Sequence, residues 1–160
     1  MAKREEITLN DKKRWGYNIS ETVGKGGRNK TADVMIIQGM FRYVAAGLGK
    51  ESLGIYDGVA GPFQLPELTG KFDTATALTL VMFETLNAQY IYKLDTIIHP
   101  GNYKGRNMNR FKPLMIITHL HVHCLASAKK QGHDDYTMGM ILSMPILLPI
   151  VGLNNMAIGA

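Results

Sequence analysis

The feature that most constrains the fold is a tight turn that leads into a helix, between residues 70 and 84. Gly70 supplies the backbone freedom that a turn needs, and Asp73 or Thr74 can accept the free N–H groups of the first helical turn. The residues that follow recur at helical spacing and end in an aromatic ring: Thr76, Leu80 and Phe83, with Ala77 and Val81 beside them. This stretch predicts a helix that buries one side, the side that carries these residues.

A second helical pattern lies upstream. Thr31 or Asp33 can cap its start, and Gly47 and Gly49 suit its end. Its apolar face consists of Val34, Ile37, Phe41, Val44, Ala45 and Leu48. We expect Phe41 to share a core with the stripe of the first helix.

A third pattern follows Pro113, a residue that suits the first position of a helix. Lys129 and Lys130 favour the negative end of the helix dipole, and Gly132 suits the stop. The apolar face consists of Leu114, Ile117, Leu120, Cys124 and Leu125. The chain is thus predicted to be mainly α-helical.

The stretch from 70 to 84 resembles the central motif of the small peptidoglycan-binding domain found in cell-wall hydrolases, phage proteins and secretion-system proteins. That family has the pattern G-x-F-G-x-x-T-x-x-A-V-x-x-F-Q. Four residues match it, and two more are near matches: Gly70, Phe72, Thr76 and Phe83, then Leu80 and Glu84. Asp73 and Thr79 depart from the family's Gly and Ala.

The segment from 23 to 38 is similar to the opening of the same domains. It reads V-G-x-G-G-x-N-x-x-x-D-V-x-x-x-Q, and Asp33, Val34 and Gln38 stand where the family's first helix carries its motif. Residues 56–62 resemble the family's turn D-G-x-x-G-P, although residues 63–69 separate it from the next helix. The resemblance covers about residues 20–105.

The resemblance implies a small three-helix peptidoglycan-binding-like core. We expect that domain, with inserted loops, at 21–132, a basic N-terminal arm at 1–20 and an apolar C-terminal extension at 133–160. Side chains in the turns beside the helices can converge on a sugar or peptide, so the predicted ligand-binding residues are Arg28, Asn29, Tyr56 and Asp57.

The charge balance is basic. The chain of 160 residues carries a net charge of +5, and its basic residues cluster early. These lysines are not interleaved with aromatic residues, as a single-strand binder requires, so no nucleic-acid partner is expected. The polar N-terminus shows no apolar signal region, which predicts synthesis in the cytoplasm without a general export signal.

The last segment, from 138 to 160, is apolar and contains Pro145 and Pro149. Its uninterrupted core is short for a membrane span, and two prolines argue against a smooth helix. We expect this tail to be buried against its own domain or against a protein partner in a larger assembly, in preference to a membrane.

His119, His121 and His123 alternate along the chain, and Cys124 follows them. On a strand the three imidazoles would share one face, as zinc ligands do, whereas on a helix they fan out by about 100° per residue. The flanking alanines and lysines favour a helix, so the main prediction includes no metal and no cofactor. A zinc site at these three histidines is the alternative.

Taken together, these features predict a non-enzymatic binding or docking module. Its ligand would be peptidoglycan, or it would be a component of a phage tail or contractile secretion device, acting in the particle or at the cell wall. One alternative is a cell-wall hydrolase with a His/Cys centre formed by His119, His121, His123, Cys124 and His133. A membrane-active toxin whose tail enters the bilayer is another.

Overall fold

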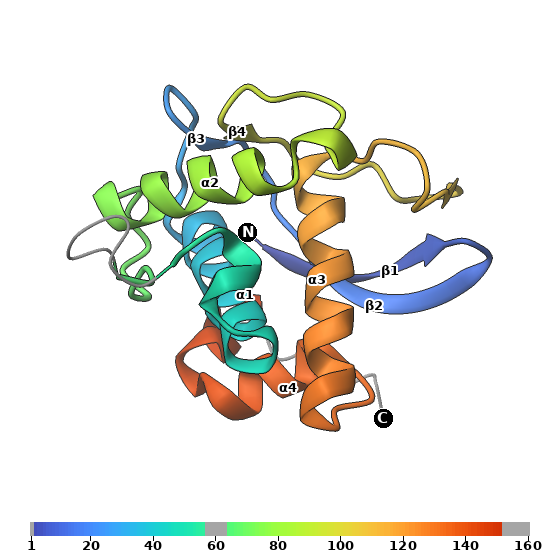
Figure 1. Ribbon diagram of the computed structural model, residues 1–160. Coiled ribbons are helices and arrows are strands. Elements are labelled where there is room, and N and C mark those ends of the chain that lie inside the picture. Colours follow the sequence, from blue (N-terminus) through green and yellow to red (C-terminus); the bar gives the residue numbers. More distant parts are fainter. Residues whose placement is uncertain (1, 57–63, 152–160) are drawn as a thin grey trace.

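The computed structural model describes residues 2–56 and 64–151 (Figure 1). It is 48% helical and 15% strand, so the chain is mainly α-helical. Asp57, predicted to bind ligand, lies outside the described residues. In chain order the elements are β1 (Lys3–Leu9), β2 (Lys12–Asn18), β3 (Val23–Gly24), α1 (Thr31–Leu48), η1 (Lys50–Leu53), α2 (Thr74–Leu86), η2 (Ala88–Tyr90), β4 (Ile97–Ile98), β5 (Asn107–Met108), α3 (Ile116–Gln131), α4 (Tyr136–Ser143), η3 (Pro145–Leu147) and α5 (Leu148–Val151).

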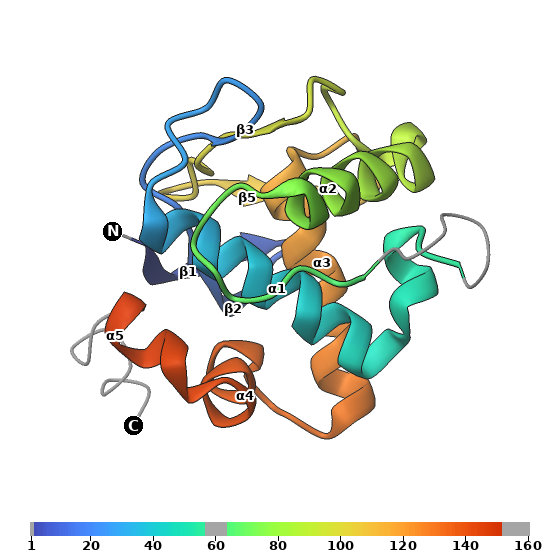
Figure 2. The same ribbon diagram turned by 90° about the vertical axis from the view of Figure 1, so that its left-hand side faces the viewer.

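Helix α1 runs through the middle of the molecule, with α2 across one side of it and α3 beside it (Figures 1 and 2). Gly47 allows α1 and α3 to approach closely, because a Cβ there would lie 2.8 Å from the carbonyl oxygen of Ser127. The Ser127 hydroxyl donates a hydrogen bond to the Tyr43 carbonyl at 2.7 Å. These contacts fix the two longest helices against each other.

The three helices occupy the stretches in which the sequence predicts them. Asp73 caps α2 by accepting a hydrogen bond from the Thr76 amide at 3.0 Å. The rings of Phe41 in α1 and Phe83 in α2 are both fully buried and meet edge to face, with centroids 5.9 Å apart. The interface between α1 and α2 is therefore aromatic at its centre.

The N-terminal segment, predicted as a basic arm, contains a β-hairpin. Residues 3–18 form the hairpin β1–β2, in which Lys3 pairs with Asn18 and Leu9 with Lys12. Asn10 and Asp11 both have positive φ, as a tight two-residue hairpin turn requires. Ile7 is fully buried in the core. Four charged residues at positions 3–6 hide the alternation of β1 in the sequence, and one of them, Arg4, is buried.

Two further pairings connect distant parts of the chain. Strand β5 pairs in parallel with β1, which makes a small sheet in the order β2-β1-β5. Strand β3 pairs with β4, with Val23 opposite Ile98. A Cβ at Gly24 would lie 2.8 Å from the Cα of Ile97, so this position needs glycine for close approach as well as for its φ of 151°.

The C-terminal segment packs on its own domain as far as it is described. Four apolar side chains of residues 136–151 are fully buried: Tyr136, Met140, Leu147 and Val151. Gly39 of α1 leaves room for Leu147, whose Cδ1 would lie 2.8 Å from an added Cβ. On the opposite side, Leu142 and Ile146 are exposed. Within the described residues, no helix has both the length and the apolar character needed to cross a membrane.

Candidate functional site

Gln38 connects the two motifs that resemble the peptidoglycan-binding domain. Its side chain is fully buried in α1, and its Oε1 accepts a hydrogen bond from the Gly70 amide at 2.9 Å. Its Nε2 lies 2.9–3.0 Å from the Thr69 hydroxyl, the Lys71 carbonyl and the Thr76 hydroxyl. One amide side chain thus holds the turn before α2 against the middle of α1.

Two other motif residues also serve as hydrogen-bond acceptors for nearby turns. The Asp33 carboxylate is fully buried and accepts hydrogen bonds from the Ser20 amide, the Ser20 hydroxyl and the Glu21 amide at 2.8–2.9 Å. Glu84 accepts one from the Thr96 amide at 3.0 Å, and burial raises its pKa above the ordinary value. These acidic side chains hold the β2–β3 and η2–β4 segments on the helices.

Asn29, a predicted ligand-binding residue, holds its own loop together. Its Oδ1 accepts a hydrogen bond from the Gly24 amide, and its Nδ2 donates to the carbonyls of Gly24 and Gly27. Arg28, beside it, is exposed, and its backbone amide donates to the Thr22 hydroxyl. Of this pair, Arg28 is the one whose side chain faces solvent.

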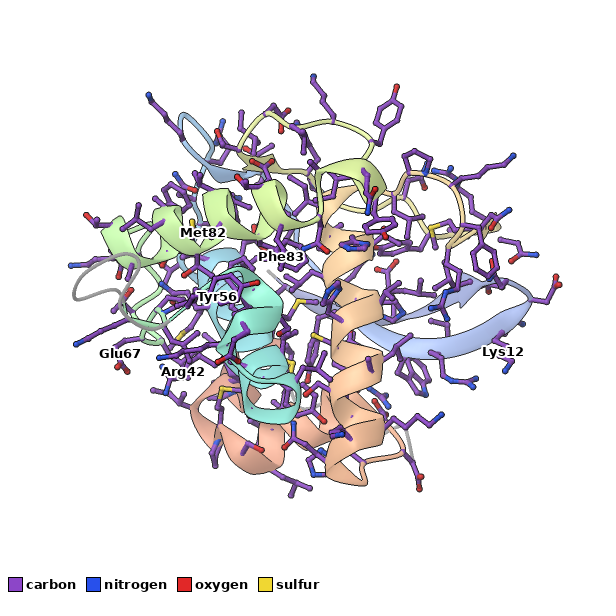
Figure 3. The ribbon with its side chains drawn as sticks, viewed as in Figure 1. Lys12, Arg42, Tyr56, Glu67, Met82 and Phe83 are labelled. Carbon is purple, nitrogen blue, oxygen red and sulfur yellow. The ribbon has the colours of Figure 1, made fainter. Side chains whose placement is uncertain are left out.

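The structure does not bring Arg28 and Tyr56 into one site. Arg28 precedes α1, whereas Tyr56 follows η1 at the far end of that helix (Figure 2). The 18 residues of α1 span about 27 Å. Tyr56 is 47% exposed and lies on the side of the molecule away from Lys12 (Figure 3). Arg28 and Tyr56 therefore occupy two separate surfaces.

The three alternating histidines lie on helix α3, so they do not share the single face that a strand would give them. His119 Nε2 is 3.0 Å from Asn87 Oδ1, while the Nδ1 of His123 is 3.1 Å from the His119 carbonyl oxygen. The partner of His121 is the Tyr136 hydroxyl. Among residues 2–56 and 64–151, no group of three or more His, Cys, Asp or Glu side chains is placed to hold a metal ion.

His121 points into the core below the hairpin. Its Nδ1 is 2.8 Å from the Tyr136 hydroxyl, which also accepts a hydrogen bond from the Tyr17 amide. A Cβ at Gly16 would lie 2.6 Å from that Nδ1, so the hairpin needs glycine at this position. Burial lowers the pKa of His121 to about 3, which keeps the ring neutral at physiological pH.

Cys124 and His133 do not form a nucleophile and base pair. The Cys124 thiol is fully buried beneath α1, with its sulfur 3.9 Å from the Met40 carbonyl oxygen, and burial raises its pKa well above the ordinary value. His133 instead stacks on Tyr43, and its Nδ1 lies 2.6 Å from the Tyr43 hydroxyl. A buried, protonated thiol is inert as a nucleophile.

A cleft of about 810 Å³ opens between the tip of the hairpin, the loop after β5 and α3; we call it the basic cleft. Its cations come from all three elements: Lys12, Arg14, Arg110 and Lys129. Phe111 stands beside it and is 84% exposed. The sequence analysis did not find this site, because its charged residues lie far apart along the chain.

The chain was compared with protein-family models, curated proteins and solved structures, and none of them matches it. The resemblance to the peptidoglycan-binding domain therefore depends on the two motifs themselves. In the structure, residues of these motifs contact one another through Gln38, and Phe41, three residues after the first motif, contacts Phe83 of the second.

Acidification is expected to destabilise the fold through the buried histidines. His119 has its pKa lowered to about 4 by burial and by the neighbouring His123, and that of His121 is lowered to about 3 by burial. An unfolded histidine takes up its proton near pH 6.5. Between pH 6.5 and about 4 the unfolded state therefore binds more protons, and the free energy of unfolding falls as the pH falls.

Urea unfolding of the wild type at pH 7 and pH 5 measures this loss of stability. The variant His119→Gln shows how much of the loss is due to His119. The variant keeps a side-chain amide near Asn87 but cannot titrate, so its loss between the two pH values should be smaller. Glu84, whose pKa is raised, acts in the opposite direction in both proteins. Equal losses in variant and wild type would show that His119 contributes nothing.

Proposed function

We propose that the protein is a non-enzymatic binding module with a three-helix core similar to the peptidoglycan-binding domain. In this proposal it binds peptidoglycan or acts as a docking component of a phage tail or a contractile secretion device. The observation that carries the proposal is the contact of Gln38, in one motif, with Gly70 and Thr76 in the other. Two stretches that resemble the same family thus meet in space through family residues.

Burial of the motif residues and of the neighbouring Phe41 supports the same core. Phe41, Leu80 and Phe83 are at most 1% exposed, and Thr76 is fully buried. The two acidic motif residues, Asp33 and Glu84, hold turns in place through hydrogen bonds to backbone amides. These polar side chains stabilise the fold. In this proposal the ligand or partner is therefore bound by exposed residues around the core.

The residues of the enzymatic alternative are engaged in different parts of the core. The Cys124 thiol is fully buried beneath α1, and the His133 ring is hydrogen-bonded to the Tyr43 hydroxyl. His119 and His121 contact Asn87 and Tyr136, respectively. These positions favour a binding role over hydrolysis. The outer side of the C-terminal segment, where Leu142 is 75% and Ile146 58% exposed, is available for contact with a protein partner.

Co-sedimentation with purified peptidoglycan tests the wall-binding form of the proposal. The full chain is expected in the pellet, with no release of soluble wall fragments. Tyr56→Ala should reduce the bound fraction, because Tyr56 is the exposed aromatic residue beside the family-like turn. Tyr92→Ala, which removes an exposed tyrosine outside that turn, is the matched control and should sediment like the wild type.

The outcomes separate the classes of function. Release of soluble fragments by the wild type would contradict the non-enzymatic proposal. Protein that stays entirely in the supernatant would exclude wall binding and leave the docking role. Equal effects of the two tyrosine substitutions would remove Tyr56 from the binding surface.

A further inference from the structure

We propose that the basic cleft binds an acidic segment of a partner protein that also presents aliphatic side chains. The inference rests on the docking role proposed above and gives the chemistry of the partner. Three features carry it: an apolar floor, a rim of exposed cations and a concave shape. Its volume of about 810 Å³ falls within the range of about 300–1,000 Å³ that is typical of ligand sites.

Apolar side chains of α3 form the floor of the cleft. Val122, Leu125, Ala126 and Lys129 follow the spacing i, i+3, i+4, i+7, so the three apolar residues and one rim cation lie on one side of the helix. The other side of α3 faces the core, where Leu120 and Cys124 are fully buried. Leu125 is half-buried and also packs against the core, so the floor of the cleft borders the core.

The rim carries uncompensated positive charge. Lys12 and Arg14 alternate along β2 and so point to the same side of the sheet, while Arg110 and Lys129 come from the other two walls. All four are exposed, and none forms an ion pair with an acidic residue in the described part of the chain. Asp134 is the single carboxylate among the described residues that line the cleft.

Charge and shape together select the occupant. Four cations against one carboxylate favour a negatively charged partner, and complementary charge raises both the rate and the specificity of docking. A single strand of nucleic acid would need a series of aromatic platforms for successive bases. Here Phe111 is the one aromatic ring other than His133 among the described lining residues, and the floor is aliphatic. Leu, Ile or Val side chains flanked by Asp or Glu fit this arrangement better.

A library of random peptides displayed on phage, selected on the full chain, tests the proposal. Selection on the wild type is followed by depletion on the double variant Arg14→Glu, Arg110→Glu. Both residues are exposed, so the variant should keep the fold, which circular dichroism can verify. The enriched peptides are expected to combine acidic and aliphatic residues and to bind the double variant about tenfold or more weakly than the wild type.

The double variant Lys104→Glu, Arg106→Glu is the matched control, because it makes the same change in net charge at exposed residues outside the basic cleft. It should bind the selected peptides within about twofold of the wild type, and binding to the wild type should weaken with added salt. Equal loss of binding in the control variant would show that binding depends on net charge and not on the basic cleft, and would overturn the proposal.

Three other results would also overturn it. These are no enrichment over the depleted pool, enrichment of basic or uncharged peptides, and tighter binding of an oligothymidine probe than of any selected peptide. Failure here is distinct from failure of the proposed function. Sedimentation with peptidoglycan but no peptide enrichment would remove only the cleft proposal, and the opposite pair of results would remove only wall recognition.

Discussion

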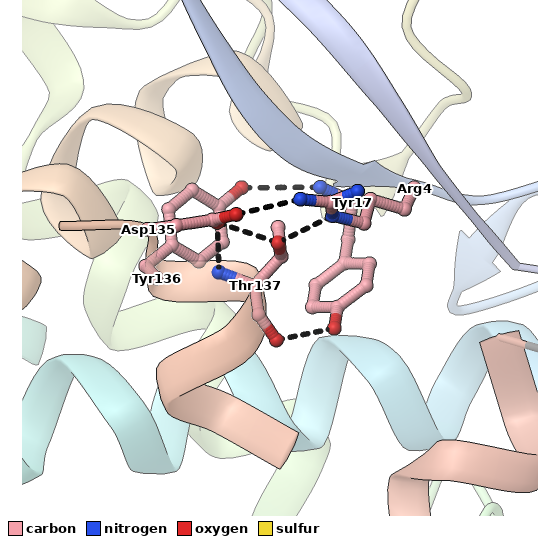
Figure 4. Close-up of polar contacts among 5 residues, drawn as sticks. All are labelled: Arg4, Tyr17, Asp135, Tyr136 and Thr137. Atoms are coloured by element: carbon pink, nitrogen blue, oxygen red, sulfur yellow. Dashed lines mark hydrogen bonds and ion pairs between the residues drawn. The ribbon is translucent and has the colours of Figure 1, made fainter. Parts of the chain in front are cut away.

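Replacing Asp135 with alanine should lower the free energy of unfolding by about 3 kcal/mol, because it removes the ion pair that Asp135 forms with the buried Arg4 side chain. The Arg4 side chain is 1% exposed, and its Nη2 lies 2.6 Å from Asp135 Oδ2 (Figure 4). The side chain of Asp135 is 23% exposed. Water can therefore reach one end of the pair, and we expect a loss at the low end of the range for buried pairs.

The same substitution removes a helix cap. Asp135 Oδ1 accepts a hydrogen bond from the Thr137 amide at 2.9 Å at the start of α4. Arg4 Nε donates to the Thr137 hydroxyl, and the Tyr17 hydroxyl donates to the Thr137 carbonyl (Figure 4). The network joins the N-terminal hairpin to α4, so its loss should weaken the packing between these two elements.

Urea unfolding monitored by far-UV circular dichroism measures the effect. Asp134→Ala is the control, because this neighbouring acid is exposed and its removal should change stability by less than about 0.5 kcal/mol. Adding Arg4→Met to Asp135→Ala should recover part of the loss, since the buried charge is then absent. If Asp134→Ala and Asp135→Ala gave the same unfolding midpoint, the ion pair would make no measurable contribution to stability.

The helical part of the fold could be predicted because its signals are local. Each of α1, α2 and α3 carries an apolar stripe at helical spacing, and α2 also has its capping residue, Asp73. The hairpin could not be predicted in the same way. Arg4 faces the core, and Lys12 and Arg14 give β2 the composition of a solvated segment. Strand β5, which pairs with β1, lies about a hundred residues away in the chain, and no local sequence pattern predicts such a pairing.

The candidate site was less predictable than the fold. The flanking residues predicted a helix for the alternating histidines, but the sequence did not give their partners, which differ for each of the three. The basic cleft is assembled from three elements that tertiary packing brings together. One signal was present in the sequence: Val122 and Ala126 extend the apolar residues of α3 beyond the face that carries Leu120 and Cys124.

Phe83→Ala should produce the largest loss of stability, about 3–5 kcal/mol, because it removes a fully buried aromatic ring at the centre of the helical core. The ring contacts side chains of two helices: its centroid lies 5.9 Å from that of Phe41 and 5.2 Å from that of His123. Alanine would leave a cavity between α1, α2 and α3. Rigid neighbours on the facing helices can close such a cavity only in part, so the lost contacts are not recovered.

Chemical denaturation of Phe83→Ala, Phe83→Leu and Leu78→Ala distinguishes core packing from helix propensity. Leu78 lies on the same helix but is 45% exposed, so its substitution should cost less than about 1 kcal/mol. Phe83→Leu should fall between the two alanine variants, because leucine fills part of the volume. Since alanine favours the helix at both positions, equal losses at positions 78 and 83 would mean that α2 is not held by this aromatic contact. The proposed likeness to the peptidoglycan-binding domain would then depend on the contacts of Gln38 with Gly70 and Thr76 alone.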